Sequence, residues 1–349
     1  MKRLRYFLSM VFFLFAFAAL AQTGVQSGKV ERIKVYGKSL EGNLAGDSPE
    51  RDVSVYLPAG YDQNPSRRYP VVFFLHGFSD SDAKVFGFEP HWMNMRDVLD
   101  EAFSKRAARE MIVVTPNAYT RFVGSMYSAS ATTGNWEEFI ARDLVEYIDA
   151  HYRTIARPEG RGLSGHSMGG YGALRIGQKF PDVFSAIYLL SPCCLSPGPF
   201  GGRENVNPER IAQVKTFDDL NKADFFTKIT FASAAAWSPN PQKPPFYLDM
   251  PFENGQEGLL ISAKWSANQP LATLDQYIFN IKKLEGVAFD AGNEDKAIAA
   301  SIKKLHESLT GYGVEHFYEE YVGDHLNRVA ERIGTTMLPF FDKTLSFEP

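Results

Sequence analysis

The sequence predicts an α/β protein built on a mostly parallel β-sheet with helices on both faces. Two segments that alternate polar and apolar residues come first, and strand-like runs then alternate with helical stretches to the end of the chain. This alternation is typical of parallel sheets, because each parallel connection must cross the sheet and usually does so as a helix. The 349 residues are 44% hydrophobic, which excludes disordered and fibrous proteins and suffices for one large core plus an insertion.

The expected elements follow in chain order. The alternating segments at residues 31–36 and 51–57 predict half-buried antiparallel strands. Nearly continuous apolar runs, typical of strands covered on both faces, occupy residues 69–75, 111–115 and 184–190. Shorter strands are expected at residues 160–165, 286–290 and 315–321. Helices are expected at residues 92–108, 136–152, 171–180, 296–309 and 327–341.

One stretch implies a reaction by its residue order. Residues 165–169, Gly-His-Ser-Met-Gly, match the Gly-x-Ser-x-Gly pattern, in which a serine sits on a strained strand-to-helix turn. The pattern is loose by itself, but a strand is expected before it and a helix after it. Ligand sites in parallel sheets lie at the carboxyl ends of the strands, which is where Ser167 falls. We therefore predict that Ser167 is a nucleophile.

A serine nucleophile needs a base, usually histidine. His325 follows the last expected strand, in a loop that can reach over Ser167, although it could also be a solvated loop histidine. His166 occupies the variable position of the serine turn, where its side chain is expected to point away from the nucleophile. The remaining histidines have structural explanations in strand ends, helices or helix ends, namely His76, His91, His151, His306 and His316. We therefore predict that His325 is the base.

The base in turn needs a carboxylate, which should come from a loop between Ser167 and His325 in the chain. The loop after residue 190 has no acid before Glu204. The strand at 286–290 leads into Asp-Ala-Gly-Asn-Glu-Asp, so Asp290 and Asp295 are the candidates. We prefer Asp295, because a glycine-containing turn could fold it back toward the histidine, whereas Asp290 suits capping or loop bonding.

Residues 195–285 lack the strand–helix rhythm and are too many for an ordinary loop. We interpret them as an inserted lid or cap that divides the core into residues 22–194 and 286–349. Aromatic residues and prolines crowd residues 237–252, and we predict that Trp237, Phe246 and Tyr247 contact substrate. The alternative is a rigid surface loop packed on itself.

The first 21 residues are expected to be a signal peptide. Three basic residues precede an apolar run over 7–20 and an Ala-Leu-Ala site, with cleavage expected after Ala21. The alternative is an uncleaved anchor, but the small-residue site favours removal, and hence a periplasmic or secreted protein without a stable membrane anchor. Removing the three cations leaves 34 basic against 41 acidic residues, a formal charge of −7, which argues against nucleic acid as a partner. The only cysteines, Cys193 and Cys194, are adjacent, and neighbours rarely form a disulfide.

Together these residues resemble the esterase D-like branch of the α/β-hydrolases, which includes S-formylglutathione hydrolases, feruloyl and acetyl xylan esterases, and mycolyltransferases. The motifs that carry the resemblance are Val-Tyr-Leu-Pro-Ala-Gly-Tyr at 55–61, Tyr-Pro-Val-Val-Phe-Phe-Leu-His-Gly at 69–77, Gly-Asn-Trp-Glu-Glu-Phe at 134–139, Gly-His-Ser-Met-Gly-Gly at 165–170, Gly-Asn-Glu-Asp at 292–295 and the loop with His325. The resemblance covers about residues 53–341 without the insertion. It implies an α/β-hydrolase fold, a Ser167–Asp295–His325 triad, and a structural role near the site for Trp136 and Glu137.

Acyl transfer also needs N–H donors for the tetrahedral oxyanion. The Met168 N–H, directly after the nucleophile, is one. The second should come from the loop after residue 75, whose place matches the oxyanion loop of α/β-hydrolases. Phe78 is the candidate, and Gly77 is the alternative.

Two features depart from the resemblance. Many relatives have Gly-His-Asp around the histidine, whereas this chain has Gly323-Asp324-His325, and compact members have no counterpart of the insertion. Glutathione-dependent hydrolysis is disfavoured, because an exported protein rarely meets that cytosolic thiol.

The sequence thus predicts a secreted or periplasmic serine carboxylesterase that needs no metal or cofactor. Its expected partner is a small-molecule or polysaccharide-linked ester, such as a feruloyl or acetyl ester of a carbohydrate. The alternatives are an acyltransferase that uses the same triad and a non-catalytic binding protein on a hydrolase scaffold.

Overall fold

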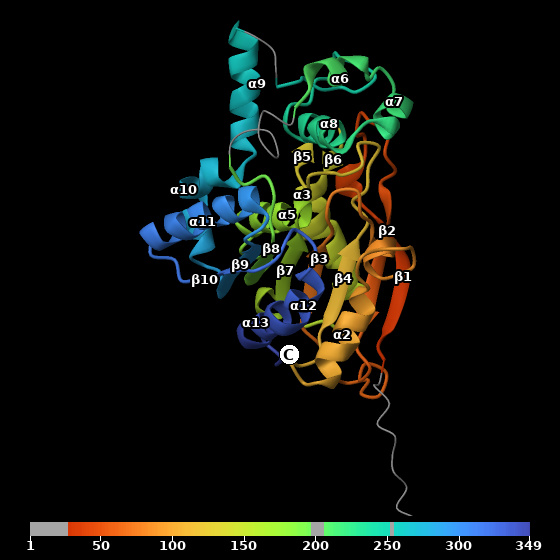
Figure 1. The fold of residues 1–349 in the computed structure, drawn as a ribbon. Helices are drawn as coiled ribbons and strands as arrows, with labels where there is room; N and C mark the ends of the chain where they lie inside the picture. The colour runs from red at the N-terminus through yellow and green to blue at the C-terminus, as the bar shows by residue number, and fades with distance from the viewer. Residues whose placement is uncertain (1–26, 197–205, 252–254) are drawn as a thin grey trace, which may run out of the picture.

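A computed structural model describes residues 27–196, 206–251 and 255–349 of the chain, in which an eight-stranded sheet forms the centre (Figure 1). The strand order is β1-β2-β4-β3-β7-β8-β9-β10; β2 is antiparallel to β1 and to β4, and the other neighbours are parallel. The strands are β1 Lys29–Tyr36, β2 Glu50–Leu57, β3 Val71–Leu75, β4 Ile112–Pro116, β7 Arg161–His166, β8 Ala186–Leu190, β9 Gly286–Gly292 and β10 Phe317–Tyr321. A separate two-stranded hairpin pairs β5 Ala129–Ser130 with β6 Gly134–Asn135. The predicted α/β class with a mostly parallel sheet is confirmed.

Helices cover both faces of the sheet (Figure 1). The core helices are α1 Asp82–Val85, α2 Met95–Ser104, α3 Trp136–Glu138, α4 Val145–His151, α5 Met168–Gly177, α11 Lys296–Gly311, α12 Val329–Arg332 and α13 Leu338–Thr344. Short 3₁₀ turns lie at Lys38–Leu40 and Pro158–Gly160. The π-helical segments Phe139–Leu144 and Ile333–Met337 join α3 to α4 and α12 to α13. The helices expected at 136–152 and 327–341 are therefore continuous but wound wider in the middle.

The alternation of side chains in β3 explains why the chain has two hydrophobic cores. Phe73 and Leu75 face one core, which includes α4 and α5, whereas Val72 and Phe74 face the other, which includes α2, α12 and α13. All five β3 side chains are buried. A central strand of a sheet covered on both faces has no solvent side, so an unbroken apolar run is the pattern that it requires.

Helices also fill the described part of the insertion, where the sequence pattern gave no regular structure. They are α6 Pro208–Gln213, α7 Phe217–Lys222, α8 Phe225–Trp237, α9 Gly255–Ala267 and α10 Pro270–Ile281. In Figure 1, α6 to α8 lie beyond the carboxyl ends of the strands, and α9 stands beside them. The helical pattern is weak in α8 because its residues from Ile229 to Trp237 are all buried, and a helix buried all round has no single apolar face.

The ends of the parallel strands are level with one another. Leu75 pairs with Gly165, His166 pairs with Leu190, and Leu190 pairs with Asp290. Loops that leave these positions therefore meet at one edge of the sheet, below the insertion.

No helix in the described ranges is both long and apolar enough to cross a bilayer. The predicted signal peptide, residues 1–21, lies outside the described residues.

Candidate active site

Ser167 sits in a left-handed turn between β7 and α5, with φ 56° and ψ −114°. A residue with a side chain adopts such a backbone only where the surroundings enforce it. Here the enforcement comes from hydrogen bonds: the Ser167 N–H donates to the Leu190 carbonyl at 3.0 Å, and the Ser167 carbonyl accepts from Tyr171 and Cys193. The turn places the serine side chain at the carboxyl edge of the sheet, as the sequence pattern predicts.

The flanking glycines allow the end of β3 to approach this turn. A Cβ on Gly169 would overlap the Leu75 carbonyl, and one on Gly165 would lie 2.6 Å from the same oxygen. The predicted start of the following helix, residue 171, is wrong, because helix α5 begins at Met168.

The first turn of α5 contains glycines, which have low helix propensity and serve close packing here, so the sequence pattern did not indicate a helix at these positions.

His325 and Asp295 meet at the same edge. Nδ1 of His325 lies 2.5 Å from Oδ2 of Asp295, and both side chains are partly exposed. The structure therefore brings together the predicted base and the preferred of the two predicted acids. A neutral imidazole has one N–H, and a carboxylate can only accept, so the proton of His325 lies on Nδ1 and Nε2 is left as an acceptor.

The loops that carry these two residues are held against each other by backbone bonds. The N–H of Asn293 donates to the Tyr321 carbonyl at 2.8 Å, and the N–H of Glu294 donates to the Gly323 carbonyl at 2.9 Å. A Cβ on Gly292 would overlap the Gly323 backbone. The contact between the two loops thus depends on glycine at position 292.

Asp324 supplies the local structure of the histidine loop. Its Oδ1 accepts the N–H groups of Leu326 at 2.7 Å and Asn327 at 2.8 Å, and these bonds lower the pKa of the Asp324 carboxyl. Such a turn shapes the backbone around the residue between acceptor and donors. The order Gly323-Asp324-His325 is therefore compatible with a positioned histidine.

Sequence reasoning missed one residue that contributes to the site, His166, which contacts the loop that carries His325. Its Nε2 lies 2.9 Å from the His325 carbonyl, and the two rings are 4.8 Å apart between centroids. The far side of its ring contacts Trp92, at 5.5 Å. Burial, and then the nearby His325, lower the pKa of His166 to about 3. The side chain thus contacts the loop of the base, and the sequence offers no signal of that contact.

Asp290, the alternative acid, lies inside the protein. Its Oδ2 accepts from the Tyr188 hydroxyl at 2.6 Å and from Nε of Arg332 at 2.8 Å. Burial raises the pKa of Asp290 to about 6. These contacts give Asp290 a role in packing β8, β9 and α12 rather than in orienting His325.

The side chains of Phe78 and Met168, whose N–H groups are the two predicted oxyanion donors, lie close together. A Cβ on Gly124 would lie 2.6 Å from the Phe78 ring and 2.8 Å from the sulfur of Met168, so these side chains converge on one glycine. Among the described residues, neither the Phe78 N–H nor the Met168 N–H has a hydrogen-bond acceptor. An unpaired N–H at the start of α5 and another in the loop after β3 are suited to donate to a developing negative charge.

The three aromatic residues predicted to contact substrate lie within packed regions of the insertion. Trp237 is 3% exposed, and its Nε1 donates to the Ser128 hydroxyl at 3.3 Å. Phe246 packs on Phe217 and Phe231, and the Tyr247 carbonyl accepts from the Thr132 hydroxyl. Contact with substrate stays a prediction for them, and the packing of Phe246 within the insertion is also what the alternative, a segment packed on itself, predicts.

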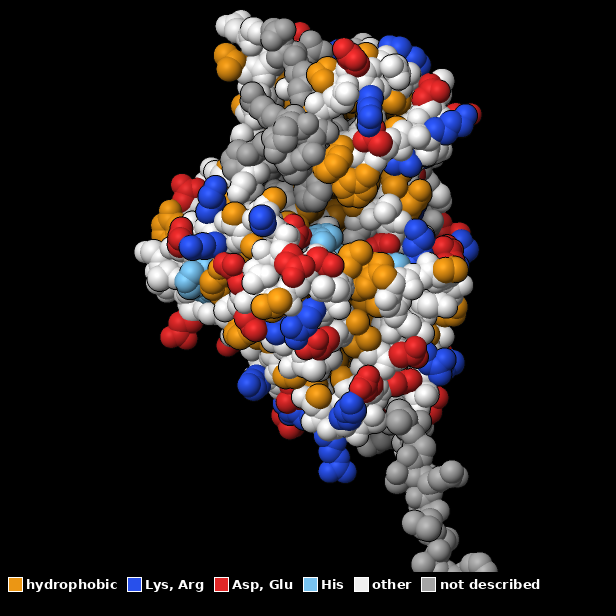
Figure 2. Space-filling model, viewed as in Figure 1, with side chains coloured by type: hydrophobic (Ala, Val, Ile, Leu, Met, Phe, Trp, Pro, Cys, Tyr) orange, Lys and Arg blue, Asp and Glu red, His pale blue; other side chains and the backbone are white. Residues whose placement is uncertain are grey.

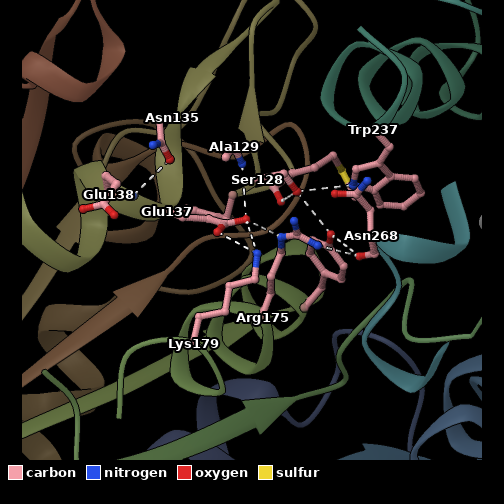
Figure 3. A network of polar contacts seen from close by, with 12 residues as sticks. Ser128, Ala129, Asn135, Glu137, Glu138, Arg175, Lys179, Trp237 and Asn268 are labelled. Carbon is pink, nitrogen blue, oxygen red and sulfur yellow. Dashed lines mark hydrogen bonds and ion pairs between the residues drawn. The ribbon is translucent and has the colours of Figure 1, made fainter. Parts of the chain in front are cut away.

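A buried polar network ties the insertion to the serine helix (Figure 3). Glu137 accepts from Nε of Arg175 at 2.6 Å and from Nζ of Lys179 at 2.8 Å. Arg175 and the Tyr171 hydroxyl in turn donate to the carbonyl of Asn268, between α9 and α10, at 2.9 and 2.7 Å. The structural role that the resemblance implied for Glu137 is thus a charged link from α3 through α5 to the insertion.

Hydrophobic side chains are exposed around this edge. Phe225 of the insertion packs edge-on against the Phe78 ring at 5.7 Å and is 47% exposed. Trp92 and Leu326 are 38% and 40% exposed. Figure 2 shows a histidine at the surface between the insertion and the core, with hydrophobic side chains above it and to its right. The surface beside the site therefore suits an apolar or aromatic group.

The fold and the chain order of serine, aspartate and histidine at one sheet edge define an α/β-hydrolase. Residues 48–329 match the protein family described as "Putative esterase", and the chain belongs to that family. It is 26% identical over 288 residues to Esterase Rv1288 of Mycobacterium tuberculosis, which covers 79% of this chain and 52% of the relative. The chain thus spans about half the length of the curated relatives that it matches first.

Solved structures share the fold. A ferulic acid esterase superposes with a TM-score of 0.62 and 22% identity, covering 91% of this chain and 99% of that one. A ferulic acid esterase of Anaeromyces mucronatus in complex with ferulic acid superposes with a TM-score of 0.53 and 20% identity, covering 93% and 94%. At these identities the likeness establishes the fold of the chain and leaves its substrate open.

Proposed function

We propose that the protein is an exported serine carboxylic ester hydrolase that acts through an acyl-Ser167 intermediate. The observation that carries the proposal is the 2.5 Å contact between Asp295 and His325, whose ring lies against the residue before Ser167. Membership of the esterase family supports the same chemistry. Export is inferred from the basic and apolar residues at 1–21.

The proposed reaction has two steps. Nε2 of His325 takes the proton from the Ser167 hydroxyl as its oxygen attacks the ester carbonyl, and the imidazolium then protonates the departing alcohol. In the second step, a water molecule loses a proton to His325 and attacks the acyl-serine, which releases the acid and restores the serine hydroxyl. Asp295 stabilises the imidazolium in both steps, and the N–H groups of Met168 and Phe78 stabilise the oxyanion.

The proposed substrates are acyl esters of carbohydrates, feruloyl or acetyl. The exposed rings of Trp92, which contacts His166, and Phe225, which contacts Phe78, support a planar acyl group. Similar structures include ferulic acid esterases, and one curated relative is Endo-1,4-beta-xylanase Y of Acetivibrio thermocellus, matched over 144 residues. An exported hydrolase would meet such esters outside the cytoplasm.

Labelling with a fluorophosphonate probe tests the nucleophile. The chain is expected to incorporate the probe at Ser167, whereas the Ser167→Ala variant stays unlabelled. A panel of methyl ferulate, p-nitrophenyl acetate and a longer p-nitrophenyl ester then compares kcat/KM between acyl groups. Folded protein that neither reacts with the probe nor hydrolyses any ester would exclude the proposed function.

A further inference from the structure

A cavity of about 580 Å³ lies between the loop after β4 and helices α7 and α8 of the insertion. Its walls combine an aromatic ring, acidic and basic side chains, an amide and a hydroxyl: Asp47, Tyr119, Thr120, Arg121, Val123, Phe217, Asp218, Asn221 and Lys228. The cavity differs in kind from the exposed apolar surface around Ser167. Four of the nine lining residues belong to the insertion, so the shape of the cavity depends on that segment.

Several of the lining polar groups have no partner among the residues that the structure describes. Oδ2 of Asp47 is buried and, among the described residues, accepts no hydrogen bond, while its Oδ1 accepts the Arg121 N–H at 2.9 Å. In the same described ranges, the side chains of Asp218, Asn221 and Lys228 make no hydrogen bond or ion pair. Unpaired donors and acceptors in a cavity wall can exchange their hydrogen bonds to water for hydrogen bonds to the hydroxyls of a ligand.

The charges of the lining are balanced. Two acidic side chains, Asp47 and Asp218, face two basic ones, and Arg121 is already engaged. Its Nη1 donates to the Ala45 carbonyl at 2.8 Å, and its guanidinium lies 3.8 Å from the centre of the Phe217 ring. A balanced set of donors and acceptors beside an exposed tyrosine ring favours a neutral polyhydroxy ligand over an anion, because a sugar offers both hydroxyls and an apolar ring face.

The cavity adjoins the candidate oxyanion loop. The carbonyl of Val123, a lining residue, accepts the N–H of Ser79 at 3.2 Å, and Ser79 directly follows Phe78. Phe225, which contacts the Phe78 ring, lies three residues before Lys228 on α8, and residues three apart share a helix face. A ligand in the cavity would therefore lie next to a group bound at Ser167.

The wall of the cavity is held in place by aromatic packing. Phe217 contacts Phe122 at 5.2 Å and Phe246 at 5.1 Å between ring centroids. Phe246 thus lies behind the cavity, where it fixes α7 against the loop after β4. A preformed site loses less entropy when a ligand binds.

We propose that this cavity binds a sugar unit of a carbohydrate ester, with the sugar ring against Tyr119 and its hydroxyls on Asp218, Asn221 and Lys228. The inference rests on the proposed ester hydrolysis at Ser167 and assigns the insertion a share in recognising the alcohol side of the substrate. The acyl group then occupies the apolar surface on the other side of the oxyanion loop.

Binding without turnover tests the cavity separately from the chemistry. The full chain with Ser167→Ala is titrated with xylotriose by calorimetry, alone and with Tyr119→Ala or Asn221→Ala added. Loss of the stacking ring or of the amide is expected to raise the Kd about tenfold. Tyr312→Ala is the matched control, because Tyr312 is 43% exposed at the end of α11 and outside the cavity. No binding of xylotriose, unchanged binding in both cavity variants, or binding of inorganic phosphate instead would overturn the inference.

Kinetics with the intact serine distinguish the inference from the proposed function. The measured quantity is the ratio of kcat/KM for a feruloylated arabinose ester to kcat/KM for methyl ferulate. In Tyr119→Ala and in Asn221→Ala this ratio is expected to fall about tenfold, because KM for the arabinose ester rises. In Tyr312→Ala the ratio is expected to stay constant. An unchanged ratio would refute the sugar site while leaving ester hydrolysis intact. If no ester is hydrolysed but xylotriose binding still depends on Tyr119, the proposed function fails and the sugar site stands.

Discussion

The ring of His166 is bonded to the backbone of His325: Nε2 of His166 lies 2.9 Å from the His325 carbonyl oxygen. Because a carbonyl can only accept, the proton of His166 lies on Nε2, and Nδ1 has no partner within the described residues. The residue before the serine thus holds the loop of the base. Serine and base, 158 positions apart in the sequence, are linked through one side chain.

We expect His166→Ala to lower kcat about tenfold with little change in KM, because small misplacements of a base are costly. His166→Gln, which keeps an N–H donor, should restore most of the loss. Steady-state kinetics over a pH series checks both variants, and His151→Ala, at an exposed position, serves as control. Equal kcat in His166→Ala and the parent would show that the bond does not position His325.

The same histidine should make folding stability depend on pH. Its pKa is about 3 in the folded protein and ordinarily 6.5, so between these values the unfolded chain binds the additional proton. The contribution of His166 to the free energy of unfolding is fully present above pH 6.5. It is lost as the pH falls toward 3, by at most about 1.4 kcal/mol per pH unit. Urea unfolding at pH 7 and pH 5 should show a smaller acid loss in His166→Gln than in the parent. An identical loss in the two proteins would contradict the prediction.

Gly292→Ala should separate the acid from the base. The added methyl group would overlap the Gly323 backbone, so the loops carrying Asp295 and His325 must move apart. We expect kcat/KM to fall about 100-fold, since a displacement of about 1 Å costs that much. Gly311→Ala is the control, because nothing lies within 4 Å of its Cβ position. Comparable activity in the two variants would count against the loop contact.

The two candidate acids should respond differently to removal of their charge. Asp295→Asn is expected to lower kcat by about 10³-fold or more with little effect on stability, because the amide disfavours the required tautomer. Asp290→Asn should instead lower the free energy of unfolding by about 3 kcal/mol, because Arg332 loses a buried partner. Urea titrations and kinetics of both variants check this; the reverse pattern would make Asp290 the acid.

Arg175→Met should loosen the link between the serine helix and the insertion. It leaves Lys179 as the one cationic partner of Glu137 in the described residues and removes a donor from the Asn268 carbonyl, so we expect a loss of about 2–3 kcal/mol in the free energy of unfolding. Lys105→Met removes an exposed pair with Glu101 and should cost less than about 0.5 kcal/mol. Thermal unfolding compares the two, and equal losses would mean that the buried network is not stabilising.

Much of the fold could be predicted because its signals are local. The apolar run of β3 and the glycines around Ser167 report burial and close packing at the same positions, and the chain order of strands fixes a parallel sheet. Ser167, Asp295 and His325 could be chosen for the same reason: each follows a strand end, and parallel strands end at one edge.

The helices of the insertion could not be predicted, because α8 is buried on several sides and shows no single apolar face. The role of His166 could not be predicted either, since its bond is to a backbone carbonyl and any residue at 325 would provide one. By itself, the sequence determined the sheet and the serine turn, and it predicted His325 as the base. Only the tertiary structure decided which acid contacts His325, what holds the His325 loop, and how the insertion packs. Those contacts join segments that are distant in the chain, so they produce no periodic pattern of residues in the sequence.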